Sequence, residues 1–404
     1  MEGEIKRVWE LEPVQPKDVG WALEKSWRTL SSDRKVSRPQ NANTVLLDYL
    51  EPGSPLHLHS ELSSETHLNT WSHFFSELSP GRIFLFTKDT NSTPAVLPNG
   101  ETLAQELVAG GVIVEGEDGR ERYSDVIFGS ITQLSPPVLL SLVRGNLQVG
   151  FRPSLIILGA PEENQLVSGL LRDASSILFS SSYWGNSGPV FSRLFQSENE
   201  LVDIEWLKVS LWRAQMRNIA LKYDLSRMNE VLSSIEIDTS VDADNRIPAE
   251  TALLMGWFVS QLQSRVVSLS AKGIECISSS GKKWFLKHNT VTEKPSQGVS
   301  SSRGVSKCQF WLTPAEEGGT YELPPSAICI QLTPEGSFET TLTIASDEVH
   351  ISGSRNERSP EEAMRRYYTR GESTATYREA LAAALDISDL LYTELTTTSE
   401  RAWS

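Results

Sequence analysis

Short apolar runs alternate with helical patterns through the first half of the chain. Thr44–Leu50, Arg82–Lys88 and Ser154–Gly159 are continuous apolar runs, which is typical of strands buried on both faces. Amphipathic or apolar helical patterns separate them, as at Glu65–Leu78 and from Pro136 to Leu147. The same pattern predicts strands at Gly111–Glu115, Tyr123–Ile131 and Ser176–Ser180, and a helix at Glu162–Arg172. This alternation predicts a helix-covered sheet that is mainly parallel or mixed.

Two helical segments rich in tryptophan open the second half. The first, Asp203–Tyr223, carries Trp206 and Trp212 on one helical face, with Asp203 suited to the N-cap. Arg213 borders this stripe. The second segment, Ala252–Leu262, follows Pro248 and is apolar nearly all round, which predicts a buried helix. Within it, Gly256 permits close backbone approach beside Trp257.

Strand-like runs follow the tryptophan helices. They lie at Lys282–His288, Lys307–Thr313, Ala327–Leu332, Phe338–Ala345 and Glu348–Ile351. Their alternation and short connections predict an antiparallel sheet. A polar loop is expected at Thr290–Gly304, and helices are expected at Pro360–Arg370 and from Ala375 to Thr396.

The change of pattern predicts two domains, with the boundary between residues 195 and 201. Residues 1–198 are expected to form an α/β domain, and residues 199–404 an α+β domain with an antiparallel sheet. A chain of 404 residues is long enough to bury a core in each.

Charge and composition narrow the function classes. The net charge of −15 and the lack of clustered Lys and Arg argue against nucleic-acid binding and against an anionic membrane surface. No apolar run is long enough to span a bilayer, and the first residues lack the pattern of a signal peptide. A cytoplasmic location is therefore expected.

Cysteine and histidine spacing offers little support for a metal site. Cys276, Cys308 and Cys329 are far apart, so buried reduced thiols are expected unless two of them meet across a sheet. His57 and His59 form an HxH pair near His67 and His73, but a surface loop and a helix start explain them better than metal ligation.

Catalytic and phosphate-binding motifs are absent from the sequence. No G-x-G-x-x-G, G-x-x-x-x-G-K-[ST] or G-x-S-x-G occurs. Gly110-Gly111 and the loop Ser180–Gly188 are the only segments suited to cradling a phosphate, and an ordinary connection between a strand and a helix explains the loop better. Asp125, Asp203 and Glu205 have no partner identifiable by spacing, so no general acid–base pair is nominated.

The tryptophan segments resemble motifs of the OpcA family of glucose-6-phosphate dehydrogenase assembly proteins. That family's D-[LI]-x-W-x-x-x-x-x-W-R corresponds to Asp203, Trp206, Trp212 and Arg213 here, and its A-x-L-x-G-W-[LF]-x-S-x-L includes Gly256 and Trp257. Weaker likenesses extend over most of the chain; in one, Ser79-Pro80-Gly81-Arg82-Ile83 resembles the family's H-P-x-R-[VI] before a strand, with Ser79 in place of the histidine.

The resemblance implies a non-catalytic partner. Such a protein binds glucose-6-phosphate dehydrogenase, assists its oligomeric assembly and activates it allosterically in the oxidative pentose phosphate pathway. NADP and the sugar phosphate would belong to the dehydrogenase, so no cofactor is expected for this chain. The six motif residues are expected to be structural or partner-binding. Arg213 is predicted to bond a carboxylate or helix-end carbonyls where the domains join.

Two other functions stay open from the residues alone. The chain could be an independent sugar-phosphate sensor or enzyme that uses the edge of the first sheet, with Ser180–Gly188 as its best support. It could also be an adaptor for other partners, which only the eleven tryptophans favour.

Overall fold

The chain forms two compact units in the computed structural model. The first comprises Met1–Ile204 and Ala363–Glu372, and the second comprises Glu205–Glu362 and Ser373–Ser404. The structure describes residues 7–32, 34, 36, 38, 42–50, 64–88, 95–96, 102–103, 107–116, 118–183, 194, 198–223, 231–240, 247–291, 304–312, 327–332, 337–344, 347–355, 364–365, 367–368 and 375–388.

An eight-stranded mixed sheet forms the centre of the first unit, in the order β1-β6-β7-β3-β2-β8-β9-β10. All neighbours from β7 to β10 are parallel, while β1, β6 and β7 pair antiparallel at one edge. The mainly parallel or mixed sheet expected from the sequence is therefore present. Its strands are β1 (Arg7–Pro13), β2 (Asn43–Asp48), β3 (Arg82–Thr87), β6 (Leu107–Glu115), β7 (Glu121–Ser130), β8 (Ser154–Leu158), β9 (Ser176–Phe179) and β10 (Glu200–Asp203).

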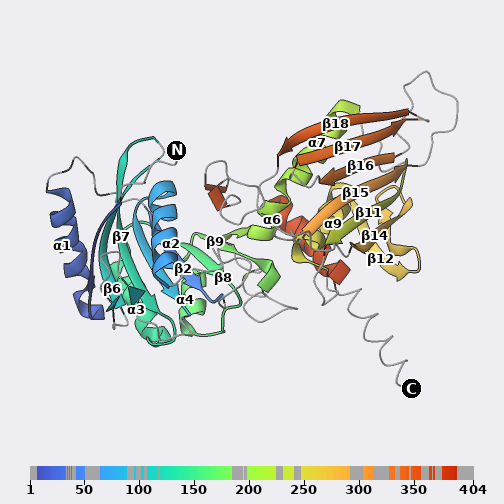
Figure 1. Cartoon of the computed structure of the whole chain (residues 1–404). Helices are drawn as coiled ribbons and strands as arrows, with labels where there is room; N and C mark the ends of the chain where they lie inside the picture. The colour runs from blue at the N-terminus through green and yellow to red at the C-terminus, as the bar shows by residue number, and fades with distance from the viewer. Residues whose placement is uncertain are drawn as a thin grey trace. The chain divides into compact units, whose positions relative to one another are not determined.

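Helices cover this sheet because its strands are apolar on both faces. Figure 1 shows α1 and α2 on opposite sides of the strands. Short apolar strands such as β2 and β8 are almost entirely buried between such layers. The helices are α1 (Val19–Ser31), α2 (Ser64–Leu78), α3 (Pro136–Asn146) and α4 (Gln165–Asp173), with 3-10 turns η1 (Pro16–Asp18) and η2 (Ser181–Tyr183) and a small ribbon of β4 (Ala95–Val96) and β5 (Thr102–Leu103).

A segment from near the C-terminus completes the first unit. Arg365 pairs with Glu77 of α2 at 3.1 Å and lies 5.6 Å from the ring centre of Phe74. Tyr368 packs edge-to-face against Phe75. Residues 364–365 and 367–368 are helical, within the helix expected at Pro360–Arg370; the other residues of that range lie outside the described part.

The second unit contains another eight-stranded sheet, in the order β12-β13-β14-β11-β15-β16-β17-β18. The sequence predicts an antiparallel sheet, and every neighbouring pair is antiparallel except one: β11 and β14 run parallel, so the sheet is mixed. The parallel pair arises because α9 connects β11 to β12 and carries the chain back over the sheet. The strands are β11 (Leu232–Ser240), β12 (Ser264–Ser270), β13 (Gly273–Ser278), β14 (Lys283–Val291), β15 (Gly304–Leu312), β16 (Ala327–Leu332), β17 (Ser337–Ile344) and β18 (Asp347–Arg355).

The tryptophan segments are helical, but the first differs from its predicted form. It comprises two helices, α6 (Ile204–Lys208) and α7 (Ser210–Tyr223), with a turn at Val209 rather than one helix. The second is α9 (Ala249–Gln261), which begins after Pro248 as expected. A further helix over residues 375–388 falls within the predicted C-terminal helix.

Glycines in the middle of β6 are structural, and the prediction that Gly110-Gly111 suits a phosphate cradle is wrong. A Cβ on Gly110 would lie 1.9 Å from the carbonyl oxygen of Glu10 on β1, and one on Gly111 would lie 2.4 Å from the Tyr123 hydroxyl. The glycines therefore allow close approach of β1 and of the Tyr123 ring.

No two of the three cysteines meet across the sheet. Cys308 faces Ile330 and Cys329 faces Gln309, so these two lie on opposite faces of β15 and β16. Cys276 lies on β13, separated from β15 by β14 and β11. The reduced thiols expected from the sequence agree with this placement, and burial, above all, raises the pKa of Cys276 to about 12.

We predict that Gly110→Ala destabilises the first unit by at least about 2 kcal/mol, because the added methyl group meets a backbone oxygen that cannot move aside cheaply. Thermal melting of the full chain measures this. Gly145→Ala in α3 is the control: no atom lies within 4 Å of its Cβ position, so helix propensity should stabilise the variant by about 0.5–1 kcal/mol. Equal melting of the two variants would contradict the assignment.

Candidate functional site

Trp206 and Trp212 are core residues of the second unit. Both are 1% exposed. The Trp206 ring packs against Tyr377 at 5.7 Å between centroids, and so joins α6 to the helix at 375–388. This burial confirms that the tryptophan stripe is core rather than an exposed contact surface.

Arg213 lies flat over Trp206. Its guanidinium carbon is 3.6 Å from the centre of the Trp206 ring, and its Nη2 donates to the Trp206 carbonyl at 3.3 Å. The accepting carbonyl belongs to the last turn of α6, so the predicted bond to a helix-end carbonyl is present. Arg213 thus fixes the angle between α6 and α7 where the helical path breaks at Val209.

Gly256 allows α9 to pack directly on the helix at 375–388. A Cβ on Gly256 would lie 2.1 Å from the carbonyl oxygen of Ala380 and 3.0 Å from the Cβ of Ala384. Next to it, Trp257 is 6% exposed and packs against Phe258. Because Tyr377, Ala380 and Ala384 are three, four and seven positions apart, one face of that helix receives both motifs.

Asp203 belongs to the first unit, unlike the other five motif residues. It is the last residue of β10 and is fully buried. Its Oδ1 accepts from the backbone N–H of Ser181 at 3.1 Å. Asp203 therefore holds the start of the Ser180–Gly188 loop, of which residues 184–188 lie outside the described part.

That contact disfavours a phosphate at the same loop. The Ser181 N–H already donates to a carboxylate, and the hydroxyls of Ser180 and Ser182 bond each other at 2.7 Å. A bound phosphate would meet the negative charge of Asp203.

The parallel strands of the first unit follow the order of dinucleotide-binding folds. In chain order they are β2, β3, β7, β8, β9 and β10, and in space β7-β3-β2-β8-β9-β10, which is the arrangement 3-2-1-4-5-6. In such sheets the ligand lies at the carboxyl ends of the strands where the order reverses, here between β2 and β8.

At that point the described residues close the crevice. The Tyr49 N–H bonds the Leu158 carbonyl at 2.8 Å, which extends the pairing of β2 and β8 beyond the strands. Gly159 has φ +82°, and a Cβ there would lie 2.8 Å from the carbonyl carbon of Tyr49. Tyr49 and Leu50 are buried where a dinucleotide fold has its glycine turn. No phosphate cradle is formed among these residues.

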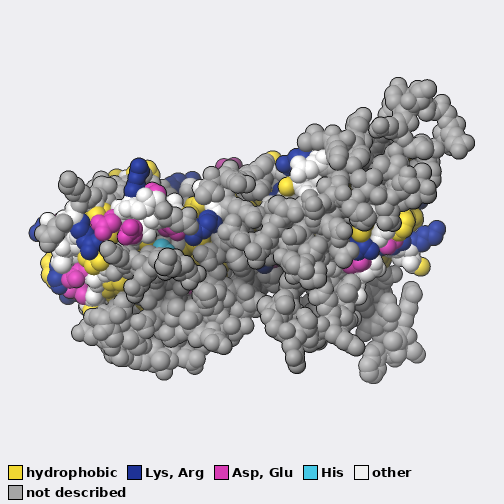
Figure 2. Space-filling view, turned by 45° about the horizontal axis from the view of Figure 1, so that its top comes forward, with side chains coloured by type: hydrophobic (Ala, Val, Ile, Leu, Met, Phe, Trp, Pro, Cys, Tyr) yellow, Lys and Arg dark blue, Asp and Glu magenta, His cyan; other side chains and the backbone are white. Residues whose placement is uncertain are grey.

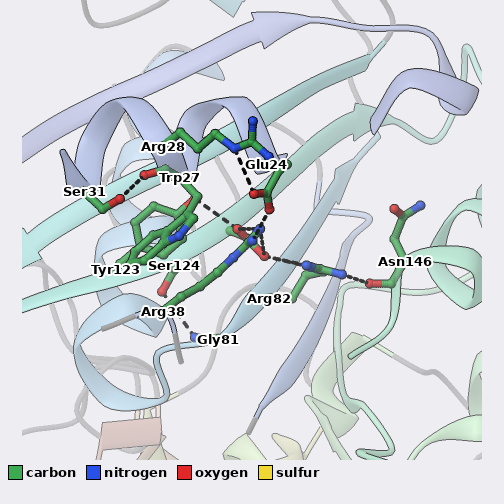
Figure 3. A network of polar contacts seen from close by, with 11 residues as sticks. Glu24, Trp27, Arg28, Ser31, Arg38, Gly81, Arg82, Tyr123, Ser124 and Asn146 are labelled. Atoms are coloured by element: carbon green, nitrogen blue, oxygen red, sulfur yellow. Dashed lines mark hydrogen bonds and ion pairs between the residues drawn. The ribbon is translucent and has the colours of Figure 1, made fainter. Parts of the chain in front are cut away.

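At the opposite, amino end of the strands, a buried carboxylate binds two arginines (Figure 3). Asp125 of β7 is 1% exposed and accepts from Arg38 at 3.0 and 3.2 Å and from Arg82 at 2.6 and 3.1 Å. Tyr123 donates its hydroxyl to the same carboxylate at 3.0 Å. Burial first, and then the charge of Asp125, raise the pKa of Tyr123, so it stays a neutral donor.

Both arginines of this cluster have further partners. Arg38 also bonds Glu24 of α1 at 2.9 Å, and Arg82 also donates to the Asn146 carbonyl at the end of α3. Burial lowers the pKa of Arg38, but the charge of Asp125 and the hydrogen bonds outweigh it, so the pKa is raised. With these partners the cluster joins α1, α3, β3 and β7, which identifies it as structural.

Sequence reasoning left Asp125 without a partner. Arg82 was visible in Pro80-Gly81-Arg82, but its partner lies 43 positions away and is set by the register of β3 on β7. Arg38 lies still farther from Asp125 in the chain.

Metal ligation finds no support in the described part of the chain. No cluster of three or more His, Cys, Asp or Glu side chains suited to a metal occurs there. His57 and His59 lie outside that part, and the side chain of His67 is not described. Among the helices that the structure describes, none has the length and apolar character needed to cross a bilayer.

Comparison with known proteins identifies no family. No protein-family model and no curated protein matches the sequence. Among solved structures, a glucose-6-phosphate dehydrogenase bound to glucose-6-phosphate has 9% identity and a TM-score of 0.45, over 87% of this chain and 91% of that chain. Another, from Mycobacterium avium, has 12% identity and a TM-score of 0.42, over 84% and 90%. The 3-ketoreductase KijD10 from Actinomadura kijaniata has 8% identity and a TM-score of 0.42, over 86% of this chain and 96% of that chain.

Likeness at this level carries no argument about activity. The structure itself defines the class: an α/β protein of two units, each built on a mixed sheet.

We predict that Asp125→Asn destabilises the first unit by about 3–5 kcal/mol, because two partly buried guanidinium groups lose their counter-charge. Thermal melting reports the loss. Asp118→Asn is the matched control, since that carboxylate is 42% exposed at the turn before the same strand and its ion pairs are worth under about 1 kcal/mol. Similar losses in both variants would refute a central role for Asp125.

We predict that Arg213→Ala lowers the stability of the second unit by about 2–3 kcal/mol, because the stacking on Trp206 and the bond to its carbonyl are both lost. Arg217→Ala, one turn further along α7 and exposed, should leave melting unchanged. Unchanged melting of Arg213→Ala together with lost partner binding would instead place Arg213 in a contact surface.

Proposed function

We propose that this chain is a non-catalytic partner of glucose-6-phosphate dehydrogenase that assists its oligomeric assembly and activates it allosterically. The observation that carries the proposal is the pair of tryptophan motifs, Asp203 to Arg213 and Ala252 to Leu262, in the order in which the OpcA family has them. In this proposal the two units correspond to the two OpcA-like domains, and the protein acts in the cytoplasm on the oxidative pentose phosphate pathway.

The roles of the motif residues support this reading. Trp206, Arg213 and Gly256 hold four helices of the second unit together, and Asp203 holds a loop of the first. Residues whose role is to hold helices together mark a family by its fold, and they need take no part in a reaction. The surface that contacts the dehydrogenase then lies elsewhere.

The first sheet also supports a protein without its own dehydrogenase reaction. It has the strand order of a dinucleotide-binding fold, but the two residues described directly after β2, Tyr49 and Leu50, are buried and neither is glycine; residues 51–63 lie outside the described part. Activation without chemistry requires only that the chain binds the active conformation of its partner more tightly than the inactive one. NADP and sugar phosphate then bind the dehydrogenase alone.

The strand order itself favours one alternative, a sensor that binds a nucleotide or sugar phosphate in the first unit. Thermal shift of the isolated chain with NADP, glucose 6-phosphate and inorganic phosphate distinguishes the two functions. The proposed partner role predicts no stabilisation by any of them, whereas a sensor would melt higher as ligand is added.

The direct test uses the dehydrogenase of the same organism. We expect the purified chain to form a complex with it on size exclusion and to lower its KM for glucose 6-phosphate, with a coupling of about 5- to 150-fold. The Arg217→Ala variant, which alters an exposed side chain of α7, serves as a folded control and should activate like the wild type. If no complex forms and neither KM nor kcat changes, the proposed function is wrong.

A further inference from the structure

The two faces of the second sheet differ in burial. On the inner face, Ile235, Leu286 and Phe310 are fully buried, and Phe258 of α9 packs edge-to-face on Phe310. On the outer face, the described side chains of β13, β14, β11, β15 and β16 are mostly half-exposed or exposed. Trp311 on that face is 42% exposed. A large aromatic side chain is thus left facing solvent on the fifth strand of the sheet, one residue from the end of β15.

The outer-face residues form rows across the strands. The first row places Phe285, Ser234, Trp311 and Ala327 side by side on β14, β11, β15 and β16. The next row is Lys287, Glu236, Gln309 and Cys329. Ser234 is only 8% exposed, since aromatic neighbours flank it on both sides. An apolar row therefore lies beside a polar one.

Acidic and basic side chains lie next to each other on the outer face of β13, β14, β11 and β15. Glu236 pairs with Lys287 at 2.6 Å, Glu275 pairs with Lys283 at 2.5 Å, and Asp238 lies 4.0 Å from Lys307. Each of these three pairs joins one acid to one base, and the exposed Arg265 of β12 lies on the same face, whereas the whole chain carries −15. Figure 2 shows the same mixing elsewhere, with acidic and basic side chains interspersed among the described side chains in view.

The sheet is large enough for a stable interface. Eight strands at about 4.8 Å spacing span about 38 Å, and strands about 25 Å long give a face of roughly 950 Å². A standard protein–protein interface buries about 800 Å² on each partner.

We propose that the outer face of the second sheet, carrying Trp311, Phe285, Glu236 and Lys287, is the surface through which two copies of this chain associate. A face on which acids and bases lie side by side complements a copy of itself, as a two-fold interface requires. A strongly acidic or strongly basic partner gains no net attraction from these three neutral pairs. Trp311 is then the apolar anchor, and the charged rows fix the register.

Sedimentation velocity of the purified full chain over a concentration series tests this inference, which does not depend on the proposed function. We expect a monomer–dimer equilibrium that strengthens as salt is raised, because salt screens the repulsion between two chains of charge −15 more than it weakens short-range pairs. A chain that stays monomeric throughout the series overturns the proposal, as does one that associates only when the dehydrogenase is added.

Trp311→Glu should raise the dimer dissociation constant by about 30-fold, the effect typical of a tryptophan that anchors an interface. Trp21→Glu is the matched control, since Trp21 lies on α1 of the first unit and is 63% exposed. That substitution should leave dimerisation unchanged. Equal effects of the two variants, or no effect of Trp311→Glu on a folded dimer, would place the interface elsewhere.

The native cysteines provide a test that needs no substitution. Cys329 is half-buried on the outer face, whereas Cys276 and Cys308 are buried on the inner one. Alkylation of Cys329, followed by mass spectrometry, should slow as the protein concentration rises through the dimer range. A labelling rate of Cys329 that is independent of concentration, in a chain that dimerises, contradicts the proposed face.

Discussion

One buried carboxylate holds together the amino end of the first sheet. Asp125 binds Arg38 and Arg82 at once, and through them it ties α1 and the end of α3 to β3 and β7. A buried carboxylate is costly unless its lone pairs are filled, and here two guanidinium groups and a phenol fill them. Because these partners come from segments distant in sequence, the cluster forms only when β3 and β7 pair in the correct register. The network therefore favours one register over its alternatives.

At the carboxyl ends of the same strands, the residues directly after β2 differ from those of a dinucleotide-binding fold. Dinucleotide folds depend on a glycine turn that lets a pyrophosphate approach the backbone at the point where the strand order reverses. Here the Tyr49 N–H bonds Leu158, and Tyr49 and Leu50 are buried at that point. The strand order is thus present together with buried, non-glycine residues directly after β2, and the described residues leave the backbone there paired with β8.

The elements with strong periodicity were predictable from sequence, and those set by long-range pairing were not. The apolar runs of β2, β3 and β8 and the helix after Pro248 lie where the pattern predicts them. By contrast, β11 to β13 carry many polar residues, and their strand character depends on pairing with β14 and β15, which sequence periodicity does not reveal. The break between α6 and α7 at Val209 was also not predictable from periodicity. It is stabilised by the stacking of Arg213 on Trp206, which is a three-dimensional contact. The burial of the tryptophans could be predicted from their helical spacing. The partners of Asp125 could not, because Arg82 reaches it only through the register of β3 on β7.

The chain passes between its units three times, after Ile204, after Glu362 and after Glu372. Residues 363–372 reach the first unit only after nearly the whole chain has been synthesised, so that unit cannot reach its final form while its own N-terminal portion is emerging from the ribosome. The same threading bears on proteolysis. A single cut near residue 204 would not release a complete first unit, because part of that unit would remain on the C-terminal fragment. Each unit is therefore built from two separate segments of the chain rather than from one continuous stretch.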